Sequence, residues 1–430
     1  MKRIPIHPLP TAPANVRWRA RHLLVAPHRL AFFAAALMFS ASGLWWGGVL
    51  LARALDHPLA WALPAPAAHA LWMCFGFMPL FIAGFCFTAG PRWLGLPPVD
   101  ARGLLVPVVA LLLSWAVAVP GFHLSMGWVA DGLALGAAAW TVLCVRFVGL
   151  LRVSHAADKQ HATLVAVACA WGALAWWVAA GAASINHTLL LRSATSLALW
   201  CFVAPVFMAV SHRMLPFLDA GTPRWLDARQ PLAMVWVVCA SLCLRGVMAV
   251  AELWWWPLPT PLLWGQATFE AAVATLLLWL ALRWRFTQNL RFRLLVMLHV
   301  GFLWLAVSFA LAAVSHAGAA LGVANMGLGL APLHAMTMGY LGTTLFAMAT
   351  RVVSGHSGHS VAADNLAWGF HWTLQAAVLS RVVAAIWPAA ATALTLLAVL
   401  AWGVATSAWA LRYGRWIGQH TPRHGASRPT

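Results

Sequence analysis

The chain has 430 residues, of which 63% are hydrophobic and only 8% are charged. Soluble proteins carry about 25% charged residues, so this composition excludes an ordinary soluble protein. The net charge of +18 would suit nucleic-acid binding, but the basic residues are spread over the segments between apolar runs, which argues against a nucleic-acid partner. Apolar runs of about 18 residues or more recur from about residue 30 onwards, and each is long enough to cross a bilayer. We therefore expect an all-α, polytopic membrane protein in contact with membrane lipid.

The apolar runs predict about twelve transmembrane helices in a single bundle over residues 30–412. In chain order they lie at roughly 30–51, 67–90, 103–121, 128–150, 162–181, 189–211, 231–250, 262–283, 293–314, 327–350, 365–386 and 389–411. Residues 1–29 and 413–430 are expected to be basic cytoplasmic tails. The first tail has neither the apolar core nor the cleavage site of a signal peptide.

The distribution of lysine and arginine predicts the orientation of this bundle. With the N-terminus in the cytoplasm, 23 of the 27 basic residues fall in inner segments and four in outer ones. The four outer residues are Arg53, Arg192, Arg245 and Arg381. Because cytoplasmic loops are enriched in Lys and Arg, this division predicts that both termini lie in the cytoplasm.

The second, sixth and tenth predicted helices share a polar pattern. Each has a histidine near its outer end (His69, His187 and His334) and an arginine near its inner end (Arg92, Arg213 and Arg351). The first and last of these helices also share the motif His-Ala-x-x-Met, in AHALWM and LHAMTM. A pattern that recurs every four helices indicates a threefold pseudo-repeat.

The depths of His69 and His334 predict a shared haem. His334 precedes Arg351 by 17 residues, about 26 Å of helix, which puts it in the outer leaflet at nearly the depth of His69. Two imidazoles at one depth can bind one haem iron from opposite faces. Gly339 and Gly342 are expected to leave a groove for the flat ring. The alternative is a pair of capping or interfacial histidines beside closely packed glycines.

Other residues extend this prediction. Arg192, Arg245 and Arg381 are expected to bind the haem propionates, since a guanidinium in the membrane needs an anion. The alternatives are a buried Arg245–Glu270 pair or side chains that extend to the interface. No Cys-x-x-Cys-His motif is present, so haem b is expected rather than covalently attached haem. Further candidate metal ligands are His187, His299 and His356.

Several segments resemble the NnrS family, whose members are described as haem- and copper-containing membrane proteins linked to nitric-oxide stress and denitrification. The segments are AHALWMCFGFMPLFIAGFCFTAGPRWLG (68–95), SHRMLPF (211–217), LHVGFLWLAVSF (298–309) and LHAMTMGYLGTTLFAMATRVVSGHSG (333–358). The matching residues are His69, Arg213, Pro216, His299, His334, Arg351 and His356. Leu71 and Trp72 stand where the family usually has a histidine and a glutamate. The resemblance therefore implies a divergent member, with haem and with one copper ligand missing.

The resemblance implies a protein of the bacterial inner membrane with a function in nitrosative stress. That function would be binding of nitric oxide or nitrosyl-iron, or electron transfer with a redox partner. The resemblance does not fix an enzymatic activity. The expected architecture is also similar to the twelve-helix core subunit of haem–copper oxidases. Two alternatives stay open at this point. One is a secondary transporter for a metal or small solute, and the other is an assembly protein without a cofactor.

Overall fold

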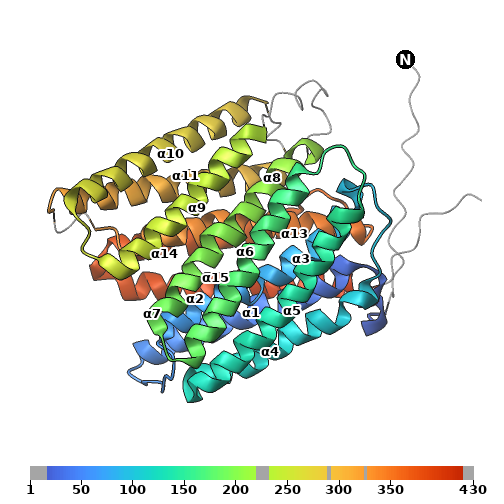
Figure 1. The fold of residues 1–430 in the computed structure, drawn as a ribbon, viewed down its shortest axis with the longest axis horizontal. Coiled ribbons are helices and arrows are strands. Elements are labelled where there is room, and N and C mark those ends of the chain that lie inside the picture. Colours follow the sequence, from blue (N-terminus) through green and yellow to red (C-terminus); the bar gives the residue numbers. More distant parts are fainter. Residues whose placement is uncertain (1–16, 219–231, 288–291, 324–326, 420–430) are drawn as a thin grey trace, which may run out of the picture.

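The computed structural model describes residues 17–218, 232–287, 292–323 and 327–419. Within these ranges the chain is helical and has no strand, which confirms the all-α fold class (Figure 1). Each predicted span coincides with a helix or with consecutive helical segments, to within a few residues. Residues 1–16 and 420–430 of the predicted tails lie outside the described residues, as does the side chain of Pro216.

The long elements follow the predicted order. They are α1 (Pro27–Ala54), α2 (Ala65–Phe75), α3 (Met78–Trp93), α4 (Leu105–Leu124), α5 (Met126–Val153), α6 (Gln160–Ser184), α7 (Thr188–Leu197), η3 (Ala198–Val203), α8 (Ala204–Leu218), α9 (Leu232–Trp255), α10 (Thr260–Thr287), α11 (Arg293–Ala320), α12 (Ala331–His334), η6 (Ala335–Gly342), α13 (Thr343–His356), α14 (Asn365–Ile386) and α15 (Ala391–Ile417). Short 3₁₀ turns η1 (Ala20–Val25), η2 (Ala101–Leu104) and η7 (Pro388–Ala390) precede α1, α4 and α15.

Ten helical segments of the described chain are long and apolar enough to cross a membrane, which supports a polytopic membrane protein. Two more predicted spans are helical but too polar to count among these ten. They are the continuous segment from α12 to α13 and the helix α14, which carry Thr, Ser, Gly, His and Gln between their apolar residues.

The three segments that carry the predicted histidine–arginine pattern occupy the interior of the bundle. The apolar windows of Ala65–Trp93 and Thr188–Arg213 are 89% and 83% buried, against 28% to 61% for the other membrane-length helices. In the third segment, every residue from 339 to 350 is buried. Helices that face the interior can carry polar groups that lipid would not tolerate, so these three segments are suited to build a site.

Each of these inner segments departs from regular α-helix at a comparable place. The break between α2 and α3 and the π-helical segments η3 and η6 all lie between 9 and 17 residues before the inner arginine of their segment. Those arginines are Arg92, Arg213 and Arg351. Single π-helical turns are rare in proteins, but those that occur are often found at functional sites. The regular spacing supports the threefold pseudo-repeat.

The break between α2 and α3 has a local cause. Pro79 has no N–H group to bond with the carbonyl of Phe75, so the helical hydrogen-bond ladder cannot continue. At Gly76 a Cβ atom would lie only 2.4 Å from the Trp72 carbonyl oxygen, so the chain can bend this tightly only with glycine.

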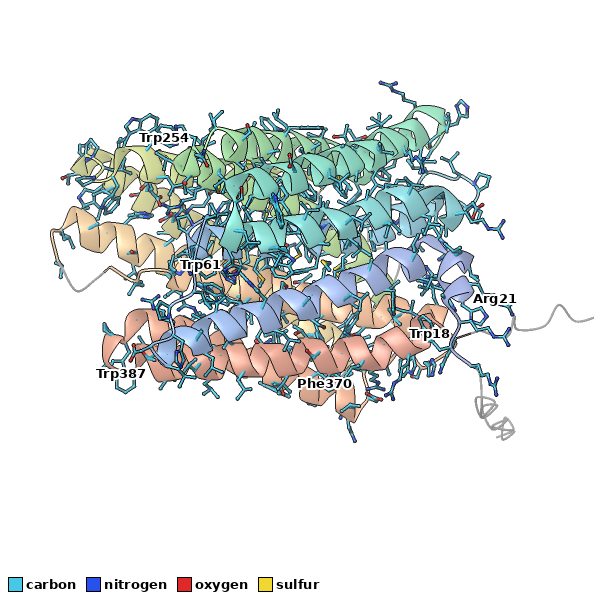
Figure 2. The ribbon with its side chains drawn as sticks, turned by 90° about the horizontal axis from the view of Figure 1, so that it is seen from below. Trp18, Arg21, Trp61, Trp254, Phe370 and Trp387 are labelled. Atoms are coloured by element: carbon cyan, nitrogen blue, oxygen red, sulfur yellow. The ribbon has the colours of Figure 1, made fainter. Side chains whose placement is uncertain are left out.

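The bundle has two distinct ends. The N–H of Arg19 donates to the carbonyl of Gly418 at 3.0 Å, so the two ends of the described chain meet; we call this the terminal end. Figure 2 shows Trp18 and Arg21 there, and Trp61, Trp254 and Trp387 at the opposite end, which we call the distal end. Exposed tryptophans at both ends of a bundle are typical of membrane interfaces.

Candidate functional site: a cavity between the two histidine motifs

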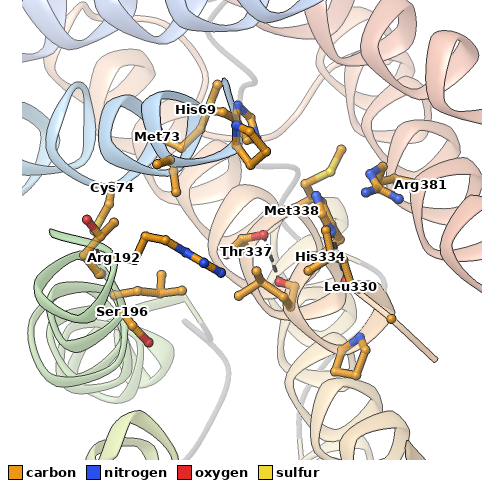
Figure 3. Close-up of a pocket in the computed structure, with 18 of the residues that line it drawn as sticks. His69, Met73, Cys74, Arg192, Ser196, Leu330, His334, Thr337, Met338 and Arg381 are labelled. Carbon is orange, nitrogen blue, oxygen red and sulfur yellow. Dashed lines mark hydrogen bonds between the residues drawn. The ribbon is translucent and has the colours of Figure 1, made fainter. Parts of the chain in front are cut away.

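A cavity of about 1750 Å³ lies in the distal half of the bundle. This is larger than the roughly 300–1,000 Å³ of most small-molecule sites. Residues of α1, α2, α7, α9, α11, α12, α14 and α15 line it. All five residues that the sequence predicted to bind a cofactor are among them: His69, Arg192, Arg245, His334 and Arg381. Figure 3 shows His69 on α2, Arg192 on α7 and His334 around one space, with Arg381 of α14 beyond His334.

His69 enters the cavity from the second turn of α2, and its ring is held by an aromatic neighbour. The imidazole stacks on the indole of Trp46 from α1, with ring centroids 4.1 Å apart and planes at 17°. Its Nδ1 atom is buried and has no hydrogen-bond partner among the described residues. A buried polar atom without a partner is costly, so the ring has capacity left for a ligand.

His334 is oriented by a hydrogen bond to its own helix. Its Nδ1 lies 2.9 Å from the carbonyl oxygen of Leu330. Because a carbonyl can only accept, Nδ1 carries the proton and Nε2 keeps its lone pair. Histidines that bind metals usually have this arrangement, with the second nitrogen donating to a carbonyl or carboxylate. The geometry therefore leaves Nε2 of His334 ready to bind a metal.

Arg192 and Arg381 supply uncompensated positive charge. Neither forms an ion pair or a hydrogen bond with another residue in the described ranges, although both line the cavity. Arg381 lies within electrostatic range of both His69 and His334. In Figure 3 the guanidinium of Arg192 points into the space between the two histidines. A cavity with such groups is suited to a ligand that carries acidic substituents.

Arg245 is in a different state from these two arginines. It pairs with Glu270 at 3.0 Å and with Glu252 at 2.9 Å, and Glu270 and Glu252 in turn contact His316. Of the alternatives that the sequence left open for Arg245, the structure therefore contains the ion pair. Its side chain reaches the cavity wall, but its charge is already compensated by carboxylates.

Several polar or aromatic residues of the wall were not predicted as site residues. Arg53, at the last turn of α1, is a further cavity arginine with no ion pair to any described residue. Trp46 and His316 were also missed. Arg53 could have been found, because it is the fourth basic residue on the predicted outer side. Nothing in the sequence pairs Trp46 with His69 or His316 with a glutamate.

The other predicted metal ligands do not join His69 and His334. His187 caps α7 by accepting from the N–H of Leu190 at 3.1 Å. His356 lies at the end of α13, against the ring of His28 on α1, with ring centroids 4.3 Å apart. His299, on α11, is not part of the cavity lining. The part of the chain that the structure describes contains no group of three or more His, Cys, Asp or Glu that could hold a metal ion.

The predicted glycine groove is wrong. A Cβ atom at Gly339 would lie 2.6 Å from the indole of Trp304, and one at Gly342 would lie 2.9 Å from Trp402. Tryptophan side chains therefore fill the space beside both glycines. The glycines permit close packing within the bundle, which was the alternative interpretation.

The family described as NnrS protein matches residues 22–420. The chain belongs to the NnrS family. The match includes α2, α7, α12 and α14, so the whole cavity lies within the family region. Membership supports a membrane protein related to nitric-oxide stress. No curated protein and no solved structure matched the chain.

The two departures from the usual NnrS pattern lie away from the cavity. Leu71 and Trp72 are both buried, and neither lines the cavity. Trp72 packs against Trp45 and Trp115, with ring centroids 5.2 and 6.1 Å apart. A ligand side chain at position 72 would point into the packing between α1, α2 and α4. The histidine pair of the cavity is thus complete despite the departures.

Proposed function

We propose that the cavity binds haem b, with the iron between His69 and His334. The observation that carries this proposal is that two histidines from different inner segments face one cavity, each with a ring nitrogen available. When bound, haem would supply a redox-active iron that can also bind nitric oxide.

The residues of the chain have separate tasks in this proposal. Trp46 restrains the ring of His69, and the Leu330 carbonyl keeps the proton of His334 on Nδ1. Arg192 and Arg381 bind the two acidic substituents of the ligand through charge-assisted hydrogen bonds. The apolar wall, which includes Met338 and Trp402, would pack against the ring.

We further propose that this site serves the nitric-oxide response by electron transfer with a redox partner or by sensing. His69 and His334 would both be engaged in holding the haem. Such an arrangement favours electron transfer or sensing over direct turnover. The positive-inside distribution supports an inner-membrane protein with cytoplasmic termini. The cavity would then lie in the outer half of the membrane.

A copper site does not fit the described residues in the same way. His187, His299 and His356 lie apart from the cavity, and no described cluster offers three suitable ligands. The proposed cofactor is therefore haem alone.

The experiment that tests the proposed function is an absorption spectrum of the purified full chain, with extraction and quantification of haem. We expect a Soret band that is lost or strongly reduced in His69→Ala and in His334→Ala. His187→Ala is the matched control, because this histidine also begins an inner segment but lies outside the cavity lining. A wild-type protein without haem, or two cavity variants with full haem content, would overturn the assignment.

One observation favours a second candidate function, a secondary transporter. Transporters bind their substrates where helices are interrupted inside the membrane, and the inner segment Ala65–Trp93 is broken between α2 and α3. Uptake of a metal or small solute by proteoliposomes, driven by an ion gradient and independent of haem content, would support this candidate.

A further inference from the structure

Four charged side chains form a closed network beside the cavity, which we call the ion quartet: Arg245 and Glu252 of α9, Glu270 of α10 and His316 of α11. Arg245 donates to Glu252 at 2.9 Å and contacts Glu270 at 3.0 Å. His316 reaches Glu270 with Nδ1 at 2.7 Å and Glu252 with Nε2 at 3.3 Å. Each carboxylate thus contacts both cations.

The position of His316 between two carboxylates favours its charged form. A neutral imidazole has one N–H and one lone pair, and a lone pair facing a carboxylate oxygen is repelled. With an acceptor at each nitrogen, the ring is held as the imidazolium. The quartet then contains two positive and two negative charges and is electrically neutral. Any proton gained or lost unbalances it.

The two glutamates differ in their access to the cavity. The side chain of Glu270 is 0% exposed, whereas that of Glu252 is 22% exposed and lines the cavity. Glu252 also has the longer contact with His316. A proton that arrives from water in the cavity therefore meets Glu252 first, and Glu270 is the inner member of the pair.

Stability alone gives a weak reason for this network. Replacing a buried ion network with apolar side chains of similar volume is often neutral or stabilising. An ionisable residue within a membrane helix is costly and is by default functional. These two glutamates are also the only ones in the 430-residue chain.

We propose that the ion quartet is a proton-binding site that responds to charge in the cavity, and this inference rests on the proposed function. When an electron from a one-electron donor enters the cavity ligand, Glu252 takes up one proton from bulk water and becomes a neutral carboxylic acid. The added negative charge is thereby balanced by one proton. Charges separated by apolar protein interact strongly, so the cavity and the quartet are electrostatically coupled.

The other charged groups around His316 do not remove this coupling. Its charged neighbours are Glu252 on α9 and Glu270 on α10, with Arg245 in contact with both of them. Across the cavity lie Arg192 of α7 and His334 of α12. Arg192 favours the carboxylate form of Glu252 until an anionic ligand occupies the cavity and compensates that arginine.

The test is infrared difference spectroscopy of the purified full chain, oxidised against dithionite-reduced, with ¹³C-labelled glutamate. Because both glutamates belong to the quartet, the label reports on this site alone. We expect a labelled carboxylic-acid band on reduction, together with proton uptake measured by a pH indicator. The band should disappear in Glu252→Gln and persist in Glu270→Gln.

Two further variants keep the test decisive. Glu252→Asp retains a carboxyl group at the site, so the protein should still fold. Because aspartate carries no label, the labelled band should be absent from this variant. Asp131→Asn, at an exposed acidic residue of α5 outside the cavity, should leave band and proton uptake unchanged. If the protein shows a Soret band but its reduction leaves both glutamates ionised, this inference alone is overturned. A protein without haem would overturn the proposed function and this inference together.

Discussion

The guanidinium of Arg245 lies 3.0 Å from the carboxylate of Glu270, a side chain that is completely buried between membrane helices. This ion pair separates Arg245 from Arg192 and Arg381, which line the same cavity without a carboxylate partner among the described residues. The three arginines look equivalent in sequence, since all lie in outer halves of predicted helices. In the structure, one compensates an internal acid and two line the cavity without such a partner.

The two uncompensated arginines should contribute to ligand affinity. We expect Arg192→Gln and Arg381→Gln each to lower haem affinity by roughly 10- to 100-fold, because each removes a charge-assisted hydrogen bond of about 1.5–3 kcal/mol. Haem transfer to an excess of a soluble haem acceptor would measure this. Affinities equal to that of the wild type in both variants would show that the acidic groups bind elsewhere.

Substitution of Arg245 should instead affect folding. Arg245→Gln leaves Glu270 buried with one cation fewer, and loss of one partner of a buried ion pair costs about 3–5 kcal/mol. Thermal unfolding in detergent should therefore show a much lower midpoint for Arg245→Gln than for Arg192→Gln, the matched control. Similar midpoints for the two variants would contradict the assignment of a structural charge to Arg245.

Close packing at Gly339 can be tested with a second glycine as reference. Gly339→Ala places a methyl group 2.6 Å from the Trp304 ring, and such overpacking costs about 1–3 kcal/mol. Gly48→Ala, in α1, meets no atom within 4 Å and should change the unfolding free energy by less than about 1 kcal/mol. If Gly339→Ala is as stable as Gly48→Ala, the space beside η6 is open and the predicted groove is restored.

The loop before α14 should show a pH-dependent contribution to stability. The Arg412 guanidinium contacts Asp364 and holds the pKa of that carboxyl below its ordinary value. A lowered pKa in the folded state stabilises at neutral pH, and the stabilisation is lost as the pH falls through that value. Because the pair is partly exposed, we expect at most about 1 kcal/mol. The wild type should have a higher unfolding midpoint than Asp364→Asn at neutral pH. This difference between the two proteins should shrink as the pH falls.

The sequence predicted the fold well because length, hydropathy and basic residues determine where membrane helices begin and end. Depth along a helix is also encoded in one dimension, and His69, His334 and the outer arginines, which were expected at one level, all line one cavity. Lateral neighbours are not encoded in this way. The packing of the helices decided between the alternatives for Arg245 in favour of the pair with Glu270. It also brought His316 to both glutamates and Trp46 onto His69.

The same limit explains the failed prediction at Gly339 and Gly342. Two small residues one turn apart predict that something approaches the helix closely, but they do not specify what. Trp304 and Trp402 lie 35 and 60 residues away in the sequence, and their indoles occupy the space. The π-helical geometry of η3 and η6 also had no clear signal, since both segments consist of residues that are common in α-helices.

The central claim is that His69 and His334 bind the same iron. Electron paramagnetic resonance of the oxidised, purified full chain tests it most directly. The structure predicts a low-spin ferric signal typical of two axial imidazoles, which converts to a high-spin signal or is lost with the haem in His69→Ala and in His334→Ala, but not in His187→Ala. A high-spin signal in the wild-type protein, or a low-spin signal that survives both cavity substitutions, would contradict the account.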